Sequence, residues 1–223
     1  MRQVLSLLLA TLLICGCEKR RENASTIVED DSEFMCALIV DMSGSFSGEM
    51  AENGRAYAFA NSILDKYFKD RIGTNDKLLI GQLSGRNEFL LWQGTPLQLR
   101  QDFASAQSFA DFLRSKANPN GSPVHDAIAQ TIEYVLDEPG VSSGKAKAAI
   151  FVLSDMLDTS APDSKEKALQ QFANFGKNGG VVGLYYVDQH LVTDWRSELR
   201  KAGVKEFCVE SGIVSRPRLP TFE

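Results

Sequence analysis

The sequence predicts a single α/β domain built on a mostly parallel sheet with helices on both faces. Apolar, strand-like runs alternate with amphipathic helical patterns along the chain, which is the order that βαβ units produce. The apolar runs lack polar alternation, as expected of strands covered on both faces. The composition, 43% hydrophobic and 24% charged, is globular and excludes collagen-like, low-complexity and wholly disordered chains.

The first strand of the predicted sheet is the continuous apolar run over residues 35–40. Residues 49–69 then repeat apolar side chains at spacings of three and four, which predicts a helix. Two further strands are predicted at 78–83 and 89–92, because the polar loop Ser84-Gly85-Arg86-Asn87 between them is short enough for a hairpin.

The second half of the chain continues the alternation of buried strands with amphipathic helices. The spacing of apolar residues predicts two consecutive helices before the next strand, and single helices after it. The predicted helices are 101–117, 123–136, 165–175 and 193–202, and the predicted strands are 148–153, 181–187 and 206–209.

Charge and motifs exclude several classes of function. Twenty-four Lys and Arg stand against 29 Asp and Glu, a net charge of −5, so the basic footprint typical of nucleic-acid binders is missing. His125 and His190 are the only imidazoles, too few for a zinc cluster. The sequence has no G-x-S-x-G elbow, Walker loop or G-x-G-x-x-G motif.

The first residues have the pattern of an export signal. Residues 4–14 form an apolar run that is too short to span a bilayer and suits the core of a signal peptide. The run ends at Ile14-Cys15-Gly16-Cys17, and a cysteine preceded by a small residue resembles the processing site of bacterial lipoprotein precursors. The resemblance implies that residues 1–16 are removed and that Cys17 is lipidated.

Lipidation at Cys17 would place the protein on the membrane of a bacterial cell envelope. The residue after the modified cysteine is Glu18. Gram-negative lipoproteins that stay at the inner membrane have Asp there, so in a Gram-negative cell the resemblance implies the outer membrane, facing the periplasm. Residues 17–33 are polar and mixed in charge, as in a flexible tether. The alternative is a soluble secreted protein cut by the ordinary signal peptidase.

Hydroxyl and carboxylate side chains follow two of the predicted strands and precede a helix between them. Asp41, Ser43 and Ser45 form a D-x-S-x-S motif after the first strand, Ser122 follows Gly121, and Asp155 follows strand 148–153. Ligands of such sheets bind beyond the carboxyl ends of the strands. We therefore expect these side chains to meet at that edge of the sheet.

The three loops, in this order, resemble the von Willebrand factor A (VWA) domain with its metal-ion-dependent adhesion site (MIDAS). The resemblance covers residues 34–210, leaving 211–223 as a C-terminal tail, and implies a three-layer, doubly wound, six-stranded sheet of strand order 3-2-1-4-5-6. It also implies that Mg²⁺ or Mn²⁺ is held by the residues of the three loops, Asp41, Ser43, Ser45, Ser122 and Asp155.

Oxygen ligands of this kind suit a small, hard cation such as Mg²⁺. An ion held mainly by neutral hydroxyls stays electrophilic, and the resemblance implies that an Asp or Glu of a protein partner completes its coordination. Two positions depart from the family pattern: Ser122 stands where Thr is commoner, and Met156 follows Asp155 where Gly is common. Met156 either alters the loop or forms part of a docking surface, and Asp158 is expected to be a solvated loop carboxylate.

Other interpretations of these residues remain open. Asp41, Ser43 and Ser122 are residue types that cap helices, and some proteins with this fold bind no metal, so a metal-free scaffold is one alternative. An enzyme is another, because an aspartate after a first parallel strand also begins phosphoryl hydrolases of the haloacid dehalogenase type. Their second acid, however, is replaced by Ser43, which argues against a general acid or base there.

Cys36 and Cys208 are the cysteines within the predicted domain. The strand order implied by the resemblance separates their strands by three steps, or about 14 Å. A disulfide requires α-carbons within about 7 Å. We therefore predict two buried free thiols.

Overall fold

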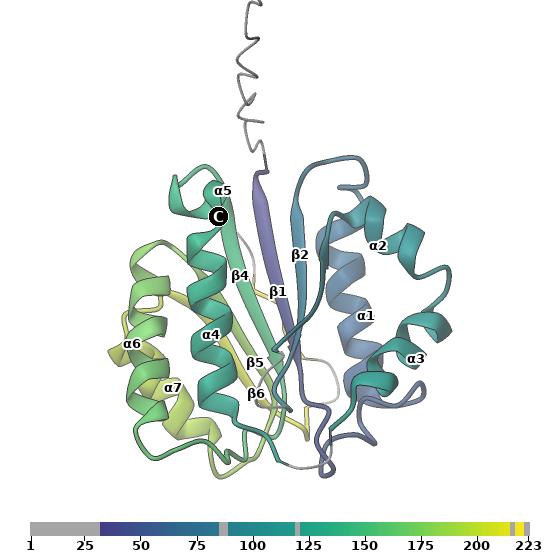
Figure 1. Ribbon diagram of the computed structural model, residues 1–223. Coiled ribbons are helices and arrows are strands. Elements are labelled where there is room, and N and C mark those ends of the chain that lie inside the picture. The colour runs from purple at the N-terminus through teal and green to yellow at the C-terminus, as the bar shows by residue number, and fades with distance from the viewer. Residues whose placement is uncertain (1–31, 85–88, 119–120, 215–216, 221–223) are drawn as a thin grey trace, which may run out of the picture.

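The computed structural model describes residues 32–84, 89–118, 121–214 and 217–220. Six strands form one sheet in the order β3-β2-β1-β4-β5-β6 (Figure 1). All neighbouring pairs are parallel except β2 and β3, which pair antiparallel. The strands are β1 Phe34–Val40, β2 Lys77–Gln82, β3 Leu90–Gly94, β4 Lys147–Leu153, β5 Val181–Val187 and β6 Glu206–Ser211. The predicted fold class and strand order are thus confirmed.

Helices cover both faces of the sheet, with α1 to α3 on one face and α4, α6 and α7 on the other (Figure 1). No helix in the described part of the chain is long and apolar enough to cross a bilayer. The helices are α1 Arg55–Phe68, α2 Pro96–Asp102, α3 Ala106–Lys116, α4 Val124–Asp137, α5 Pro139–Ser142, α6 Ser164–Lys177 and α7 Val192–Lys201.

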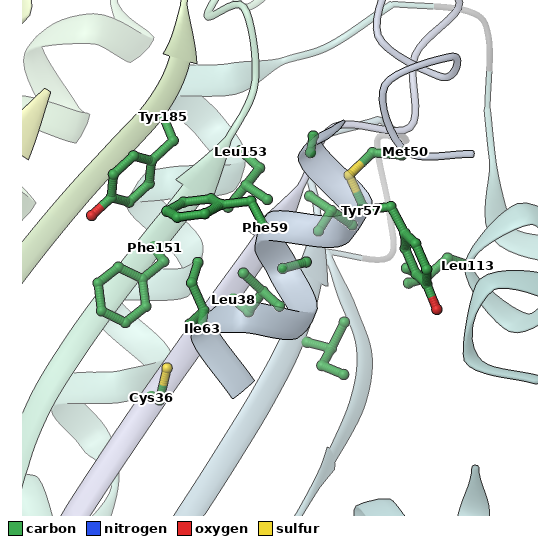
Figure 2. Packing of buried hydrophobic residues seen from close by; sticks show 14 of the residues in the cluster. Cys36, Leu38, Met50, Tyr57, Phe59, Ile63, Leu113, Phe151, Leu153 and Tyr185 are labelled. Atoms are coloured by element: carbon green, nitrogen blue, oxygen red, sulfur yellow. The ribbon is translucent and has the colours of Figure 1, made fainter. Parts of the chain in front are cut away.

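Strand β1 divides the core into two halves, because successive side chains of a strand point to opposite faces. Cys36 and Leu38 pack beneath α1, whereas Met35 and Ala37 pack beneath α4. On the α1 face, Phe59 meets Tyr185 edge-to-face at 4.7 Å between ring centroids (Figure 2). Every residue of β1 is buried, so the strand that ends at Asp41 is held firmly from both sides.

Two predicted helices differ from the structure. The helix predicted over 49–69 begins only at Arg55, because residues 44–53 form consecutive turns. These turns close at Gly54, where a β-carbon would lie 2.1 Å from the Glu49 carbonyl oxygen, so only glycine fits. The helix predicted over 101–117 corresponds to α3, which begins only at Ala106, because Ser105 caps its start with a capping box. Helix α2, which begins after the capping box of Thr95 and ends at Asp102, was not predicted.

The other predicted elements agree with the structure to within about two residues, and the short helix α5 was not predicted. The predicted hairpin is confirmed by the antiparallel pairing of β2 and β3, although its residues 85–87 lie outside the described residues. Both cysteines of the domain are free thiols, as predicted. Cys208, however, is half-buried rather than buried, because it lies on the edge strand β6.

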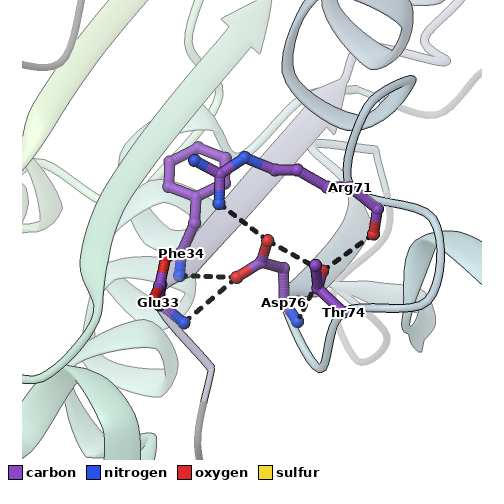
Figure 3. A network of polar contacts seen from close by, with 5 residues as sticks. All are labelled: Glu33, Phe34, Arg71, Thr74 and Asp76. Atoms are coloured by element: carbon purple, nitrogen blue, oxygen red, sulfur yellow. Dashed lines mark hydrogen bonds and ion pairs between the residues drawn. The ribbon is translucent and has the colours of Figure 1, made fainter.

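At the amino edge of the sheet, Asp76 fastens the start of β1 to the loop before β2 (Figure 3). Its Oδ1 accepts hydrogen bonds from the amides of Glu33, at 3.1 Å, and Phe34, at 2.9 Å. Its Oδ2 accepts from Arg71 at 2.8 Å and from the Thr74 hydroxyl at 2.9 Å. The packed body therefore includes Glu33, the last residue of the predicted tether.

The segment assigned by sequence to a C-terminal tail is also partly packed. The Tyr67 hydroxyl donates to the Pro220 carbonyl at 2.6 Å, and the Tyr185 hydroxyl donates to the Arg218 carbonyl at 2.7 Å. The Arg218 amide in turn donates to Glu210 of β6 at 3.0 Å. Residues 217–220 thus lie against the α1 side of the sheet, whereas the predicted signal peptide and Cys17 lie outside the described residues.

Candidate metal site

Asp41 lies at the carboxyl end of β1, wholly buried, and joins three loops. Its Oδ1 accepts hydrogen bonds from the Ser43 amide and from the Ser122 hydroxyl, both at 2.9 Å. Its Oδ2 accepts from the Ser154 hydroxyl at 2.7 Å. One carboxylate therefore connects the loop after β1, the loop before α4 and the loop after β4.

The outer half of the site is formed by Ser43, Ser45 and Asp155. The hydroxyl oxygens of Ser43 and Ser45 are 3.3 Å apart, and the Ser45 hydroxyl donates to Asp155 Oδ2 at 3.1 Å. Ser45 is exposed and Asp155 half-buried, whereas Ser43 is buried. The structure thus brings all five residues predicted from sequence into one hydrogen-bonded network at the carboxyl edge of the sheet.

The capping roles left open by the sequence do not occur. The residue that precedes α1 is Gly54, far along the chain from Asp41 and Ser43. Ser122 makes no capping hydrogen bond to α4, because its hydroxyl is directed to Asp41. The three side chains therefore serve the network rather than a helix end.

Ser154 belongs to this network, and the sequence analysis did not include it. Its hydroxyl donates to Asp41 and accepts a hydrogen bond from the Met156 amide at 2.9 Å. Ser154 is wholly buried, so it links the two aspartate loops from within. The sequence feature that could have indicated its role is its position, directly after an apolar strand and directly before Asp155.

Met156, at the position where glycine is common in the family pattern, adopts a backbone conformation that favours glycine. Its φ of 63° lies in the left-handed region, which costs a residue with a β-carbon about 1 kcal/mol or more. The side chain is only 3% exposed and packs in the core on the α4 face. Met156 is therefore buried and lies outside any docking surface; Leu157, 52% exposed, is the apolar side chain that faces outward there.

Asp158 is an exposed loop residue, as the sequence suggested, but its carboxylate is held by other side chains and a backbone amide. It accepts hydrogen bonds from the His125 amide at 3.2 Å and from the Ser160 hydroxyl at 2.7 Å, and pairs with the His125 ring at 2.6 Å. Burial raises the pKa of Asp158, but the hydrogen bonds from the His125 ring, Ser160 and the His125 amide outweigh burial and lower the pKa to about 2. Asp158 thereby ties the start of α4 to the loop that carries Asp155.

The donor set of the network fits a hard divalent cation. It contains three hydroxyls and two carboxylates, all oxygen donors of the kind that Mg²⁺ and Mn²⁺ take. Within the described residues, no Lys, Arg or His pairs with Asp41 or Asp155, and no three His, Cys, Asp or Glu side chains cluster as metal ligands. The network therefore has two acids, several hydroxyls and no cation of its own.

The structure is a doubly wound α/β domain with an oxygen-rich network at the carboxyl edge of its sheet. Comparison with solved structures identifies its fold. The chain is similar to the Rpn10 VWA domain (TM-score 0.56, 11% identity, covering 80% of this chain and 87% of that one). It is also similar to the manganese-loaded TRAP protein of Plasmodium vivax (0.54, 17%, 81% and 69%). A third similar structure is the TFIIH p34 N-terminal domain (0.53, 11%, 82% and 93%).

These similarities show that the chain has the von Willebrand factor A fold. No protein-family model matches the sequence, and a search of curated proteins finds no match. At identities of 11 to 17%, the similarity concerns the fold alone.

Proposed function

We propose that this chain is an exported, lipid-anchored protein whose VWA-fold domain binds a partner protein through a divalent cation. Ser43, Ser45, Ser122 and Asp155 would hold Mg²⁺ or Mn²⁺ together with Asp41, whose wholly buried carboxylate would supply negative charge behind the hydroxyls. A cation bound there attracts a carboxylate, so the partner offers an Asp or Glu to the site. Cys17 would carry the lipid, and residues 18–31 would form the tether, because Ser32 is already buried in the folded domain.

One observation carries the proposal: a buried aspartate that no Lys, Arg or His of the described residues neutralises. Asp41 is wholly buried, and its hydrogen-bond partners are a backbone amide and two hydroxyls. A buried charge is costly unless it is paired or coordinates a metal. Asp155, linked to the same network through Ser45, adds a second negative charge that favours a dication. The manganese-loaded TRAP neighbour supports the choice of ion.

The geometry speaks against a phosphoryl hydrolase that uses Asp41 as its nucleophile. Such a nucleophile needs an accessible oxygen, whereas Asp41 is 0% exposed and both of its oxygens accept hydrogen bonds. A binding module is also what a VWA fold commonly provides. We therefore propose no catalytic activity.

The metal site is tested by calorimetric titration of Mg²⁺ and Mn²⁺ into the full chain. We expect Asp155→Asn and Ser45→Ala each to weaken the binding of the ion at least tenfold, because both side chains supply oxygens to the outer half of the network. The matched control is Asp163→Asn, since Asp163 is exposed and makes no capping hydrogen bond. No uptake of either ion at millimolar concentration would contradict the proposal.

A metal-free scaffold is the second candidate, and one observation favours it. Both oxygens of Asp41 have hydrogen-bond partners from the protein itself, so the network holds together through its own donors. A scaffold of this kind would show no change in melting temperature with Mg²⁺ or Mn²⁺. The metal-binding domain is expected to be stabilised in proportion to the logarithm of the ion concentration once that exceeds the dissociation constant.

The anchor is tested by substituting Cys17 and, as the matched control, Cys15. We expect Cys17→Ala to lose palmitate labelling and to leave the membrane fraction, because a thiol is needed to receive the lipid. Cys15→Ala is expected to keep both properties. Labelling that persists in Cys17→Ala would refute the lipid assignment without affecting the metal site.

A further inference from the structure

A cavity of about 500 Å³ lies directly beside the candidate metal site. Its walls come from Phe89 before β3, from Pro123 and Asp126 at the start of α4, and from Thr159 in the loop after β4. The Thr159 amide donates to the Ser122 carbonyl at 2.9 Å. Two of the three loops that form the metal site therefore also form this cavity.

Among the described residues that line the cavity, Asp126 is the charged one. It is half-buried in the first turn of α4, and within the described residues its carboxylate has no hydrogen-bond or ion-pair partner. Asp158, in the neighbouring loop, has three hydrogen bonds instead. A half-buried carboxylate without a partner is a place where a cation from outside gains an ion pair in a partly desolvated setting.

The remaining walls suit a cation on an alkyl stem. Phe89 offers an aromatic ring, fixed by an edge-to-face contact with Tyr134 at 6.0 Å, and Pro123 offers an apolar ring. Alkyl stems of Lys and Arg pack on such surfaces, and their charged ends bind aromatic faces. Gln130, one turn after Asp126 on the same side of α4, adds an amide oxygen that can accept a further N–H.

We infer that this cavity is a second subsite, the Asp126 pocket, that receives an arginine or lysine side chain of the partner protein. The inference rests on the proposed function for the source of the cation, because the same partner places its Asp or Glu at the metal site. The partner surface thus carries an acid and a base side by side. The chain's net charge of −5 favours the approach of such a base.

The pocket is tested first without metal or partner, using n-butylguanidinium and n-butylammonium as fragments of Arg and Lys. Two-dimensional amide NMR of the full chain is expected to show shifts at residues 124–130 and 159–161 with millimolar affinity. Asp126→Asn should weaken this binding at least fivefold, and Asp163→Asn should not. The neutral n-butylurea should produce no such shifts. Absence of binding, or unchanged binding in Asp126→Asn, would overturn the pocket.

The link to the metal site is tested with peptides in the presence of Mg²⁺. Each peptide carries one Glu and one Arg separated by zero to four glycines, and its control carries citrulline in place of Arg. We expect at least one spacing to bind five times more tightly than its control, and Asp126→Asn to remove this gain while binding that depends on Glu persists. No gain at any spacing would overturn the two-point contact.

The two experiments separate failure of the pocket from failure of the proposed function. If the fragments bind but no peptide binds through Glu and Mg²⁺, the metal-dependent function is wrong and the pocket stands as a cation site. If Glu-dependent binding occurs but the fragments do not bind, the metal site stands and the pocket is refuted.

Discussion

An aspartate is buried near each end of β1, one at the amino edge of the sheet and one at the carboxyl edge. The two carboxylates differ in whether a cationic side chain pairs with them. At the amino edge, Asp76 is 1% exposed and is paired with Arg71 at 2.8 Å. At the carboxyl edge, Asp41 is 0% exposed and is held by two hydroxyls and an amide. At the amino edge the charge of the aspartate is therefore paired, whereas at the carboxyl edge no cationic side chain of the described residues pairs with it.

The difference distinguishes a buried aspartate that only stabilises the fold from one that we propose takes part in binding. The four hydrogen bonds of Asp76 fasten strand and loop to each other, so its role ends within the fold. Asp41 makes a comparable number of contacts, but none comes from Lys, Arg or His among the described residues. A matched Asp→Asn substitution at each edge therefore tests whether the distinction is real.

Asp76→Asn is expected to have the largest effect, lowering the free energy of unfolding by about 3 kcal/mol. The amide keeps an oxygen for the Phe34 amide, but it turns an N–H group toward the donors of Arg71 and Thr74. Urea unfolding at pH 7 measures the loss. Arg71→Gln, at a side chain that is 41% exposed, should cost less. A loss for Asp76→Asn below about 1 kcal/mol would show that the amino edge does not depend on this pair.

Asp158→Asn is expected to cost about 1 to 2 kcal/mol at pH 7, because the pKa of Asp158 in the fold is about 2, below its usual 3.8. A lowered pKa stabilises the fold above the usual value, and this contribution disappears as the pH falls from about 4 toward 2. The difference between wild type and Asp158→Asn should therefore shrink across this window. Urea unfolding at pH 5, 4, 3 and 2 checks it, and a constant difference would contradict the assignment.

Asp41→Asn in chelator is expected to have the smallest effect, at most about 1 kcal/mol. The amide oxygen still accepts from Ser43 and Ser122, and removal of an unbalanced buried charge offsets the altered contact with Ser154. Millimolar Mg²⁺ should raise the melting temperature of the wild type only. If Asp41→Asn without metal lowers the free energy of unfolding as much as Asp76→Asn does, the charge of Asp41 is already balanced within the protein. The proposed difference between the two edges would then be wrong.

The strands were predictable because a strand buried on both faces has a continuous run of apolar residues, as in β1 and β5. Helix limits were less predictable. The start of α1 depends on a turn that closes onto Gly54, and the starts of α2 and α3 depend on the capping side chains of Thr95 and Ser105. These are short-range contacts that apolar periodicity does not record, so the pattern merged turns and caps into longer helices.

The residues of the candidate site were predictable where they come directly after a strand. Asp41 and Asp155 end adjacent parallel strands, so strand order alone brings them together. The roles of Ser154 and Asp158 were not predictable in this way, because they depend on contacts with Asp41 and His125, which are 113 and 33 residues away. The Asp126 pocket likewise exists only where separate loops meet.

Strand β1 has a mechanical consequence. It pairs in parallel with β2 on one side and β4 on the other, and its seven residues span about 20 Å between Phe34 and the carboxyl edge. A force applied at Phe34 and opposed at the carboxyl edge acts along the strand. The hydrogen bonds that join β1 to β2 and to β4 are then loaded in shear. Hydrogen bonds loaded in that direction must break together rather than one after another, so the two ladders resist a force directed along β1.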